Sequence, residues 1–432
     1  MLANFHTRGF VSFFLGFLLC YAVVAAYLRS KCYRDPSSIF FRPESARVLT
    51  YSSFRKAQAQ KFGDLAALHA VAKWANSTTP ELCIGVASVS RHGFSYLKET
   101  LGSILEGLDD LERQRIYLVV FLAHTDQSQH EDFRKPWLVN MADSLPTYPS
   151  DTETIGLVRQ LEIDGNYEAH ARKQKIDYSV LLEECAKVHP QYTMTLEDDV
   201  IALDGWYHRA LSALQTATQK TRELGRDSFL YLRVFYDGRL LGWNSEEWPL
   251  YVESSLAVLI VEVITLLLLR WRIAAMRKTL TLSIILVLCG VCTPLLIGLF
   301  FAAGRNCMLP KTPGVHLMHQ YGCCAQGLVF PQRQVLDNLL PLYRNTQDDH
   351  AAVDTFLEDW ANHHDSLRWA VTPVLIQHVG GKSSHGAGDQ ESGSLTDDMP
   401  FDYSFEMNDP IKLAKEHKAW VAEMKRTNTR QQ

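Results

Sequence analysis

The sequence predicts an α/β protein with a doubly wound sheet, anchored in a membrane near its N-terminus and interrupted by a second membrane segment. Three observations support this prediction. Apolar strands alternate with amphipathic helices over residues 82–235, three apolar segments are long enough to cross a bilayer, and three adjacent acids follow one strand. With 432 residues and 47% hydrophobic content, the chain can bury a full core, and its length predicts two or three domains.

The strands and helices of the α/β part are predicted from the spacing of apolar residues. Before the membrane hairpin we expect strands at 82–90, 116–123, 192–196 and 229–235, and helices at 94–108, 178–188 and 206–224. After it we expect strands at 327–330 and 373–377, a helix at 351–361 and a short helix at 411–424. The stretch 383–398 is rich in Gly, Ser and Asp, a composition that predicts disorder.

The three apolar segments are 10–28, 252–271 and 279–303. No small-residue cleavage site follows the first, which predicts a retained signal anchor rather than a removed signal peptide. The other two enclose a loop, 270–278, that carries four basic residues. The positive-inside rule places this loop in the cytosol, so the two segments form a hairpin and the body of the protein is lumenal.

Charge and cysteine usage agree with a lumenal body. The net charge of −5 shows no basic excess, so no nucleic-acid partner is expected. Three of the nine cysteines, Cys20, Cys289 and Cys292, lie in apolar runs and are expected to be free. The other six could form disulfides in an oxidising lumen, in a pairing that the sequence leaves open: Cys32, Cys83, Cys185, Cys307, Cys323 and Cys324. Asn76 begins a formal glycosylation sequon.

The most informative motif is Glu197-Asp198-Asp199, which follows the expected strand 192–196. Three carboxylates at the end of a buried strand repel one another and lose hydration, unless a hard cation such as Mg²⁺ or Mn²⁺ is bound. Strand alternation predicts that Glu197 and Asp199 share one face and Asp198 points to the other. The alternative is a solvated acidic turn. We predict a metal site, with Asp199 in direct contact with the metal.

Several motifs in order resemble a known family. They are Ile84 to Arg91, Asp177-Tyr178, Leu196 to Val200, Ala352 to Trp360 and Gln377 to Ser384. This order resembles the GT-A glycosyltransferases of the N-glycan GlcNAc-transferase IV type. A membrane hairpin between the acid-bearing and His-bearing parts makes the chain more similar to the post-GPI-attachment GalNAc-transferase family of the Golgi. The resemblance covers about residues 82–386.

The resemblance implies a multi-pass Golgi membrane enzyme whose lumenal GT-A domain is split by the hairpin. Such an enzyme transfers a sugar, expected to be GalNAc, with inversion from a UDP-sugar to a mannose of the GPI-anchor glycan, using Mn²⁺ or Mg²⁺. The implied organisation is a cytosolic tail 1–9, an anchor 10–28, a stem 29–80, a first half 81–250 for donor and metal, a hairpin 252–303, a second half 304–388 for acceptor and base, and a polar tail 389–432.

An inverting displacement needs a base on the side of the sugar away from the diphosphate. Asp354 is the candidate, because it borders the apolar face of the expected helix 351–361 and matches the family's Val-Asp-x-x-Leu pattern. Glu358, one turn later, is the reserve. The alternative for both is a solvated acidic flank.

Six residues are candidates for binding the donor. His378 is expected to complete the metal shell or to donate to the diphosphate, although a lone His is more often a packed core residue. Gly380 and Lys382 follow it in a short phosphate-binding loop. Arg91 is expected over the phosphates or ribose, or is a surface cation. Asp177 either holds the uracil or caps its helix, and Asp198 completes the donor-binding set.

Two other functions remain open at this point. An N-glycan GlcNAc-transferase of the IV type would share the motifs but would have no use for a hairpin. A catalytically silent membrane lectin or partner of the same fold would retain the motifs without turnover. In the preferred reading the partners are the UDP-sugar, the GPI-anchor glycan and the membrane.

Overall fold

The computed structural model describes residues 2–75, 79–91, 93–320, 322, 324–345, 351–381 and 399–431. The chain forms two compact units, each built from two stretches. The first combines Met1–Val48 with Gly238–Lys311, and the second combines Leu49–Asp237 with Thr312–Gln432. The expected disordered stretch 383–398, the Asn76 sequon and Lys382 lie outside the described residues.

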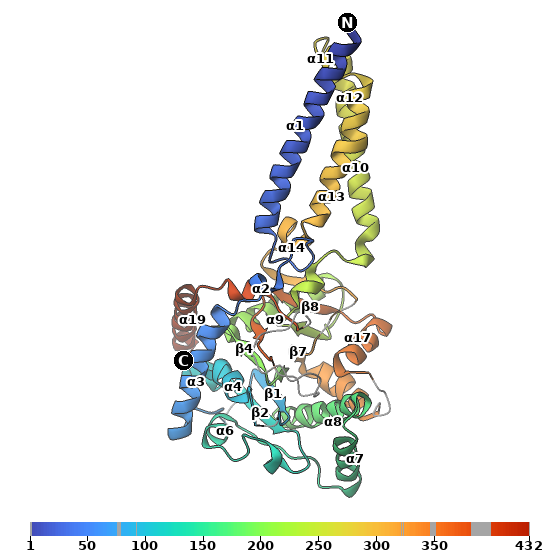
Figure 1. The fold of residues 1–432 in the computed structure, drawn as a ribbon. Helices are drawn as coiled ribbons and strands as arrows, with labels where there is room; N and C mark the ends of the chain where they lie inside the picture. The colour runs from blue at the N-terminus through green and yellow to red at the C-terminus, as the bar shows by residue number, and fades with distance from the viewer. Residues whose placement is uncertain are drawn as a thin grey trace. The chain divides into compact units, whose positions relative to one another are not determined.

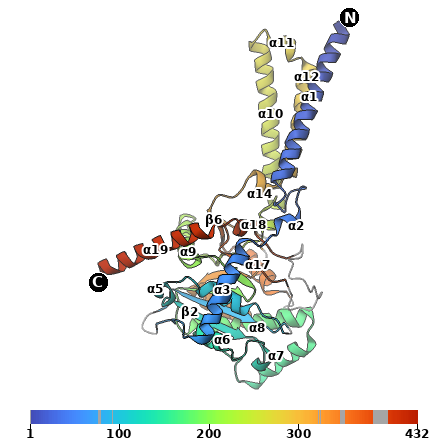
Figure 2. The same cartoon turned by 60° about the vertical axis from the view of Figure 1, so that its left-hand side comes forward.

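The first unit is helical. Its elements are α1 (Leu2–Lys31), α2 (Pro43–Ala46), η2 (Gly238–Leu241), η3 (Ser245–Glu247), α10 (Trp248–Arg272), α11 (Met276–Thr279), α12 (Leu282–Val287), the π-helical η4 (Leu288–Cys292), α13 (Thr293–Ala302) and α14 (Arg305–Met308). Three helical spans in it are long and apolar enough to cross a membrane: Val11–Lys31, Gly238–Arg272 and Leu282–Ala302. They run side by side in Figures 1 and 2. The basic loop 270–278 falls at the connection between the last two spans.

A disulfide between Cys32 and Cys307 joins the end of α1 to α14, across 275 residues of sequence. Cys20, Cys289 and Cys292 are free, as predicted. In the second unit Cys83 is bonded to Cys185.

The second unit is built on a seven-stranded mixed sheet with the order β2-β1-β3-β7-β5-β8-β6. The strands are β1 (Leu82–Ser88), β2 (Ile116–Leu122), β3 (Tyr192–Glu197), β5 (Tyr231–Arg233), β6 (Gly314–Leu317), β7 (Gly327–Pro331) and β8 (Arg368–Thr372). A separate antiparallel pair joins β4 (Val200–Ala202) to β9 (Ile376–His378). Strands β1, β2 and β3 are parallel, whereas β7 runs antiparallel to both its neighbours.

Helices surround the sheet. They are α3 (Tyr51–Leu68), α4 (Leu97–Leu105), α5 (Asp110–Arg113), η1 (Gln127–Gln129), α6 (Pro136–Met141), α7 (Thr152–Asp164), α8 (Tyr167–Ala186), α9 (Trp206–Glu223), α15 (Gln332–Gln334), the π-helical η5 (Val335–Leu339), α16 (Leu340–Asn345), α17 (Val353–His363), α18 (Tyr403–Glu406) and α19 (Pro410–Gln431).

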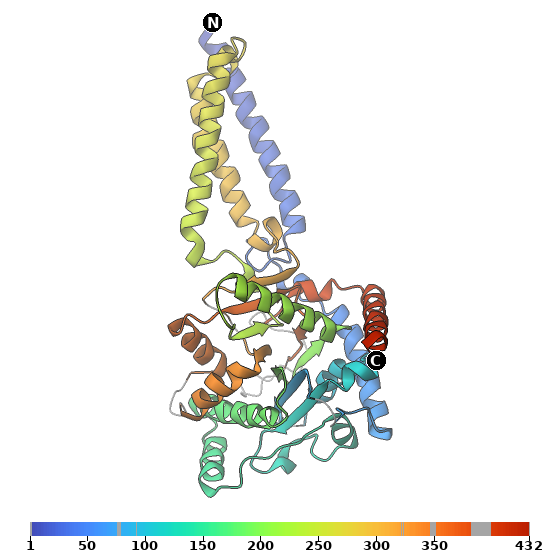
Figure 3. The same ribbon diagram turned by 180° about the vertical axis from the view of Figure 1, so that it is seen from behind.

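Helix α8 packs on one face of β1 and β2, as can be followed in Figure 3. A Cβ at Gly85 would lie 3.3 Å from Leu181, and the Cys83–Cys185 disulfide joins β1 to α8. The right-handed β1-α4-β2 crossover places α4 on the other face. There α3 crosses α4 so closely that a Cβ at Gly102 would lie 2.4 Å from the carbonyl oxygen of Ala59.

The structure confirms most of the expected elements and corrects three. Helix α8 begins at Tyr167, eleven residues before the expected start at residue 178, so Asp177 lies inside it and is not an N-terminal cap. Strand β9 pairs with β4 outside the main sheet, and β8, which was not predicted, takes a place in that sheet. The expected stem, 29–80, is divided between the units, because α3 belongs to the second.

Candidate active site

The carboxyl ends of β1 and β3 meet at one edge of the sheet. The two strands are parallel neighbours, with Ala87 opposite Glu197. The loop after β1 therefore lies beside the acidic motif after β3. A cavity of about 770 Å³ opens at this edge, within the range of small-ligand sites. Its lining includes Arg91, Asp177, all three acids of the motif, His378 and Gly380.

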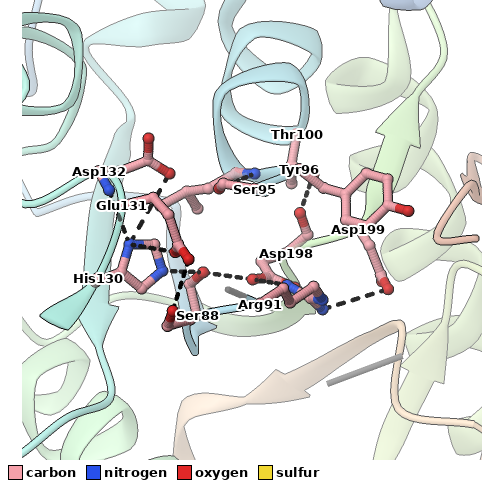
Figure 4. Close-up of polar contacts among 12 residues, drawn as sticks. Ser88, Arg91, Ser95, Tyr96, Thr100, His130, Glu131, Asp132, Asp198 and Asp199 are labelled. Carbon is pink, nitrogen blue, oxygen red and sulfur yellow. Dashed lines mark hydrogen bonds and ion pairs between the residues drawn. The ribbon is translucent and has the colours of Figure 1, made fainter. Parts of the chain in front are cut away.

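The middle acid of the motif faces away from the other two. Both oxygens of Asp198 accept hydrogen bonds from the Arg91 guanidinium, each at 2.7 Å. Asp198 also accepts a hydrogen bond from the hydroxyl of Ser88, and its backbone carbonyl accepts one from Thr100 at 2.6 Å. Figure 4 shows these contacts around the buried Asp198. Arg91 Nη2 also lies 3.5 Å from Asp199 Oδ2, so this guanidinium lies between the two aspartates.

Glu197, Asp199 and His378 form the cluster that could hold a metal ion, because one ligand atom from each lies within 4.8 Å of the others. The β4–β9 pairing brings His378 here, since it places Val200 opposite His378. The Nε2 atom of His378 lies 3.3 Å from Asp199 Oδ2.

The cluster fits a divalent cation. Two buried atoms in it, Asp199 Oδ1 and His378 Nδ1, make no hydrogen bond within the described part of the chain. Two carboxylates and one imidazole are a suitable ligand set for Mn²⁺ or Mg²⁺. Asp198 lies outside this group, because Arg91 occupies both of its oxygens.

The acids of the cluster have shifted pKa values. Burial and the neighbouring Asp199 raise the pKa of Glu197 to about 8. Burial also opposes ionisation of Asp199, but His378 and Arg91 outweigh it and lower the pKa of Asp199. One acid therefore holds a proton that a cation would displace, and the other stays ionised.

Gly380 is required at its position by the approach of Asp199. A Cβ at residue 380 would lie 2.3 Å from Asp199 Oδ2 and 3.1 Å from His378 Nε2. We expect Gly380→Ala to displace the Asp199 carboxylate and to weaken metal binding by roughly tenfold or more. Titration of Mn²⁺ into the purified variant and the wild type measures this. The control is Gly156→Ala in α7, where a Cβ meets nothing within 4 Å. Equal Mn²⁺ affinities of Gly380→Ala and wild type would contradict the expectation.

Asp177 lines the cavity from the interior of α8. It accepts hydrogen bonds from the Tyr148 hydroxyl and from Lys173 Nζ, the latter at 2.9 Å. Burial raises its pKa. Asp177 is therefore placed by two partners at the wall of the cavity.

The two candidate bases on α17 lie in different surroundings. Asp354 is half-buried at the start of the helix, and its Oδ2 accepts a hydrogen bond from the Cys324 amide at 3.2 Å. Its charge also raises the pKa of Glu197, after burial and Asp199, so it lies within electrostatic reach of the cluster. Asp354 does not line the cavity formed by the described residues.

Glu358 is buried and fully engaged. It accepts hydrogen bonds from Arg233 at 2.7 Å, from Arg368 at 2.6 Å and from the Tyr231 hydroxyl. These donors occupy both of its oxygens, and Glu358 does not line the cavity formed by the described residues. The expectation that Glu358 stands in reserve for Asp354 is therefore not supported by its surroundings.

Apart from Asp177, sequence reasoning missed the contribution of α7, α8 and the loop after β2 to the cavity. Lys173, Gln174 and Tyr178 of α8 line it, with His124 beyond β2. Lys173 donates to the Ala123 carbonyl as well as to Asp177. One sign of this wall is present in the sequence. Lys173 and Asp177 are four residues apart, a spacing at which opposite charges pair on a helix, and the segment around them has no apolar stripe.

Comparison with known proteins gives the class first: the chain is similar to glycosyltransferases. Residues 82–377, more than half of the chain, match the family described as GPI-N-acetylgalactosamine transferase PGAP4. The chain belongs to this family.

More distant similarity extends to three curated proteins. The chain is 28% identical over 148 residues to alpha-1,3-mannosyl-glycoprotein 4-beta-N-acetylglucosaminyltransferase B of Danio rerio, which covers 30% of this chain and 25% of the relative. It is 27% identical over 188 residues to the C enzyme of Danio rerio, covering 39% and 37%. It is 27% identical over 149 residues to the mouse alpha-1,3-mannosyl-glycoprotein 4-beta-N-acetylglucosaminyltransferase-like protein MGAT4D, covering 32% and 38%. The chain thus spans between a quarter and two fifths of the length of these relatives.

Proposed function

We propose that this protein transfers N-acetylgalactosamine from UDP-GalNAc to a mannose of the GPI-anchor glycan, with a divalent metal and with inversion at the anomeric carbon. The observation that carries the proposal is the Glu197–Asp199–His378 cluster on a cavity of about 770 Å³, in a chain of the GPI-N-acetylgalactosamine transferase PGAP4 family. The cavity lies at the carboxyl ends of β1 and β3, where open α/β sheets bind nucleotides.

The donor would be held by the metal site and by the cavity walls. Mn²⁺ or Mg²⁺, held by Glu197, Asp199 and His378, would neutralise the diphosphate leaving group. Asp198 acts as a positioning residue that orients the Arg91 guanidinium beside the acids. Asp177 and Lys173 are the polar groups at the α8 wall, where they would bind the nucleotide. Gly380, with Lys382 after it, would complete the phosphate end.

We assign the base to Asp354. In the displacement, the acceptor hydroxyl oxygen forms a bond to the anomeric carbon as the bond from that carbon to the diphosphate oxygen breaks. The hydroxyl proton passes to the Asp354 carboxylate, and UDP leaves with the electron pair. Glu358, locked between Arg233 and Arg368, would hold α17 in position for this step.

A lumenal Golgi location is part of the proposal. The Cys32–Cys307 and Cys83–Cys185 disulfides support an oxidising compartment for the residues on both sides of the second and third apolar spans. With the basic loop 270–278 in the cytosol, those spans form a hairpin that returns the chain to the lumen. The hairpin would hold the active site close to the membrane, where the GPI glycan is also tethered. The effective concentration of the acceptor at the enzyme is therefore raised.

The affinity for the metal should depend on pH. Because the folded pKa of Glu197 is raised to about 8, Glu197 carries a proton below that pH, and the cation must displace it. We expect the Mn²⁺ affinity to increase by about tenfold per pH unit as the pH rises towards 8, more steeply at the acid end, and to level off above pH 8. The acid end is steeper because His378 must also lose a proton: burial lowers the pKa of His378, but Asp199 outweighs it and raises that pKa. Isothermal titration with Mn²⁺ in buffers between pH 6 and pH 9 measures this, with roughly one proton released per ion from Glu197 below pH 8 and a further one from His378 at the acid end. An affinity independent of pH across this window would contradict the assignment of Glu197.

The proposal is tested by a donor screen on the detergent-solubilised full-length chain. UDP release is followed for UDP-GalNAc and UDP-GlcNAc with Mn²⁺, with and without a GPI-glycan acceptor. Faster release from UDP-GalNAc in the presence of acceptor supports the proposal. Preference for UDP-GlcNAc, the donor type that the names of the distant relatives indicate, would favour an N-glycan branching enzyme. No release from either donor with acceptor present would favour a silent protein of the same fold.

A further inference from the structure

A second buried cluster of metal-ligating side chains lies away from the cavity, where the C-terminal helix meets the α/β unit. Glu112 of α5, His208 of α9 and His417 of α19 each offer one ligand atom, and these atoms lie within 4.8 Å of one another. Their exposed fractions are 0%, 9% and 5%. None of them lines the cavity of the candidate active site.

His417 is oriented as a metal-binding histidine is. Its Nδ1 lies 2.8 Å from a carboxylate oxygen of Asp204, so Nδ1–H donates to Asp204 and the Nε2 lone pair points the other way. Nε2 faces both oxygens of Glu112, at 2.9 and 3.1 Å. A carboxylate behind the ring is the usual outer partner of a metal-bound imidazole.

A positive charge is required between His417 Nε2 and Glu112. A lone pair and a carboxylate that face each other in a buried place repel unless a proton or a cation lies between them. Two ligands of a tetrahedral zinc ion, each about 2.0–2.1 Å from the metal, are separated by roughly 3.3 Å. The observed 2.9 and 3.1 Å are within a few tenths of an ångström of that separation.

His208 supplies the observation that a proton alone does not explain. Its Nδ1 is buried and makes no hydrogen bond to any residue that the structure describes. Its ring stacks against the rings of His417 and Trp420, with centroid distances of 5.4 and 5.1 Å. An ion pair of His417 with Glu112 and Asp204 does not involve this nitrogen, whereas a metal ion would bind it.

The local backbone is built to hold His208 there. Gly205, which precedes α9, has φ +69°, and a Cβ on it would lie 2.5 Å from His208 Cε1 and 3.2 Å from His417 Cβ. Only glycine fits this backbone conformation and this contact. Arg209 Nη1 lies 3.0 Å from His208 Nε2, and Arg209 also pairs with the partly exposed Glu416. If Nδ1 of His208 binds a metal, the ring proton is on Nε2. Arg209 can then move away from Nε2 and keep its pair with Glu416.

We propose that Glu112, His208 and His417 form a structural zinc site, with Asp204 as the outer partner of His417, that fastens α19 to the α/β unit. Two imidazoles and one carboxylate are a zinc ligand set. This proposal does not rest on the transferase activity.

Helix α19 needs such a fastening. It contacts α9 through His208 and Arg209, at the first turn of that helix, and its other ion pairs to the unit involve exposed side chains. Glu416, which pairs with Arg209, is 45% exposed, and Lys425, which pairs with Asp109, is 53% exposed. Exposed ion pairs contribute little, on the order of 1 kcal/mol or less each. Leu413 is its buried apolar anchor in the described part of the helix.

The test uses the full-length, tag-free chain in detergent. It is made in an Asp199→Ala background, which removes one ligand of the active-site cluster so that this cluster does not bind the metal. The protein is stripped with a chelator, given zinc chloride and freed of excess by gel filtration. Bound zinc is counted by mass spectrometry, and the thermal midpoint is measured with and without zinc. His208→Phe is added because it keeps the stacked ring and the Glu112–His417–Asp204 contacts but removes the ligand nitrogen. His363→Ala, an exposed histidine of α17, is the matched control.

We expect one zinc per chain and a raised thermal midpoint in the background and in the His363→Ala control. His208→Phe should lose the zinc and the zinc-dependent shift, and Asp204→Asn should weaken zinc binding by about 10- to 100-fold. Cobalt in place of zinc should give the visible absorption of a tetrahedral site that His208→Phe abolishes. No retained zinc in the background, or retention unchanged by His208→Phe, would overturn the proposal and leave a protonated His417 between two carboxylates.

Discussion

Replacing Asp199 by alanine should abolish sugar transfer, lowering the rate by on the order of a hundredfold or more. Asp199 is the ionised member of the cluster, and its Oδ1 is buried without a hydrogen-bond partner among the described residues. Its loss removes a metal ligand and leaves Glu197 and His378 unable to hold the ion. The measurement is UDP release from UDP-GalNAc with acceptor over a range of Mn²⁺ concentrations.

The control for this substitution is Asp227→Ala, an exposed aspartate between α9 and β5. It should leave the rate unchanged. Asp199→Asn should also fail, because the amide keeps the size of the carboxylate but not its charge. Wild-type turnover by Asp199→Ala at micromolar Mn²⁺ would contradict the metal-site assignment. A thermal midpoint equal to that of the wild type would exclude misfolding as the cause of the loss.

Asp354→Asn should lower kcat by about 10²- to 10⁴-fold, the range expected when a general base is removed. Asp354 is half-buried at the first turn of α17, and its charge reaches Glu197. It does not belong to the metal cluster, so Mn²⁺ affinity and donor binding should stay close to the wild-type values. Steady-state transfer kinetics together with a UDP-binding titration separate the two effects.

Asp359→Asn provides the matched control on the same helix, since Asp359 is exposed. It should have wild-type kinetics. If Asp354→Asn turned over normally, or lost donor affinity in parallel with kcat, Asp354 would not be the base and a group on the cavity wall would have to be considered.

The acidic motif could be predicted from the sequence because its signals are local. In the sequence, residues 193–196 alternate Thr with Met or Leu, and continuing this alternation to residues 197–199 separates Asp198 from its neighbours. In the structure β3 ends at Glu197 and its interior is buried on both faces, so the burial of the strand does not itself show the alternation. The partner of Asp198 could not be predicted. Arg91 lies 107 residues earlier in the chain and meets Asp198 only because β1 and β3 are neighbours.

The start of α8 was missed because the helix does not have an ordinary amphipathic pattern. Its first eleven residues, 167–177, include Lys173 and Lys175, which are buried, and Asp177, which lines the cavity. Polar residues occupy positions where the 3.6-residue period calls for apolar ones. The departure from the pattern thus coincides with the wall of the candidate site.

The placement of His378 and Glu358 depended on tertiary structure. His378 reaches Asp199 through the β4–β9 pair, which lies outside the main sheet and has no sequence signal of its own. Glu358 was predicted beside Asp354 from helix spacing, yet Arg233 of β5 and Arg368 of β8 surround it. Strand β8 itself was not predicted, so this pair of arginines could not be anticipated.

The most direct test of the proposed function is transfer of radiolabelled GalNAc from UDP-GalNAc to two acceptors, a GPI-anchor glycan and an N-glycan core, by the wild type and Asp199→Ala. We expect labelled GPI glycan, in a product whose new bond has the anomeric configuration opposite to that of the donor. We also expect no transfer by Asp199→Ala. Label on the N-glycan alone, or retention of the donor configuration, would contradict the proposed function.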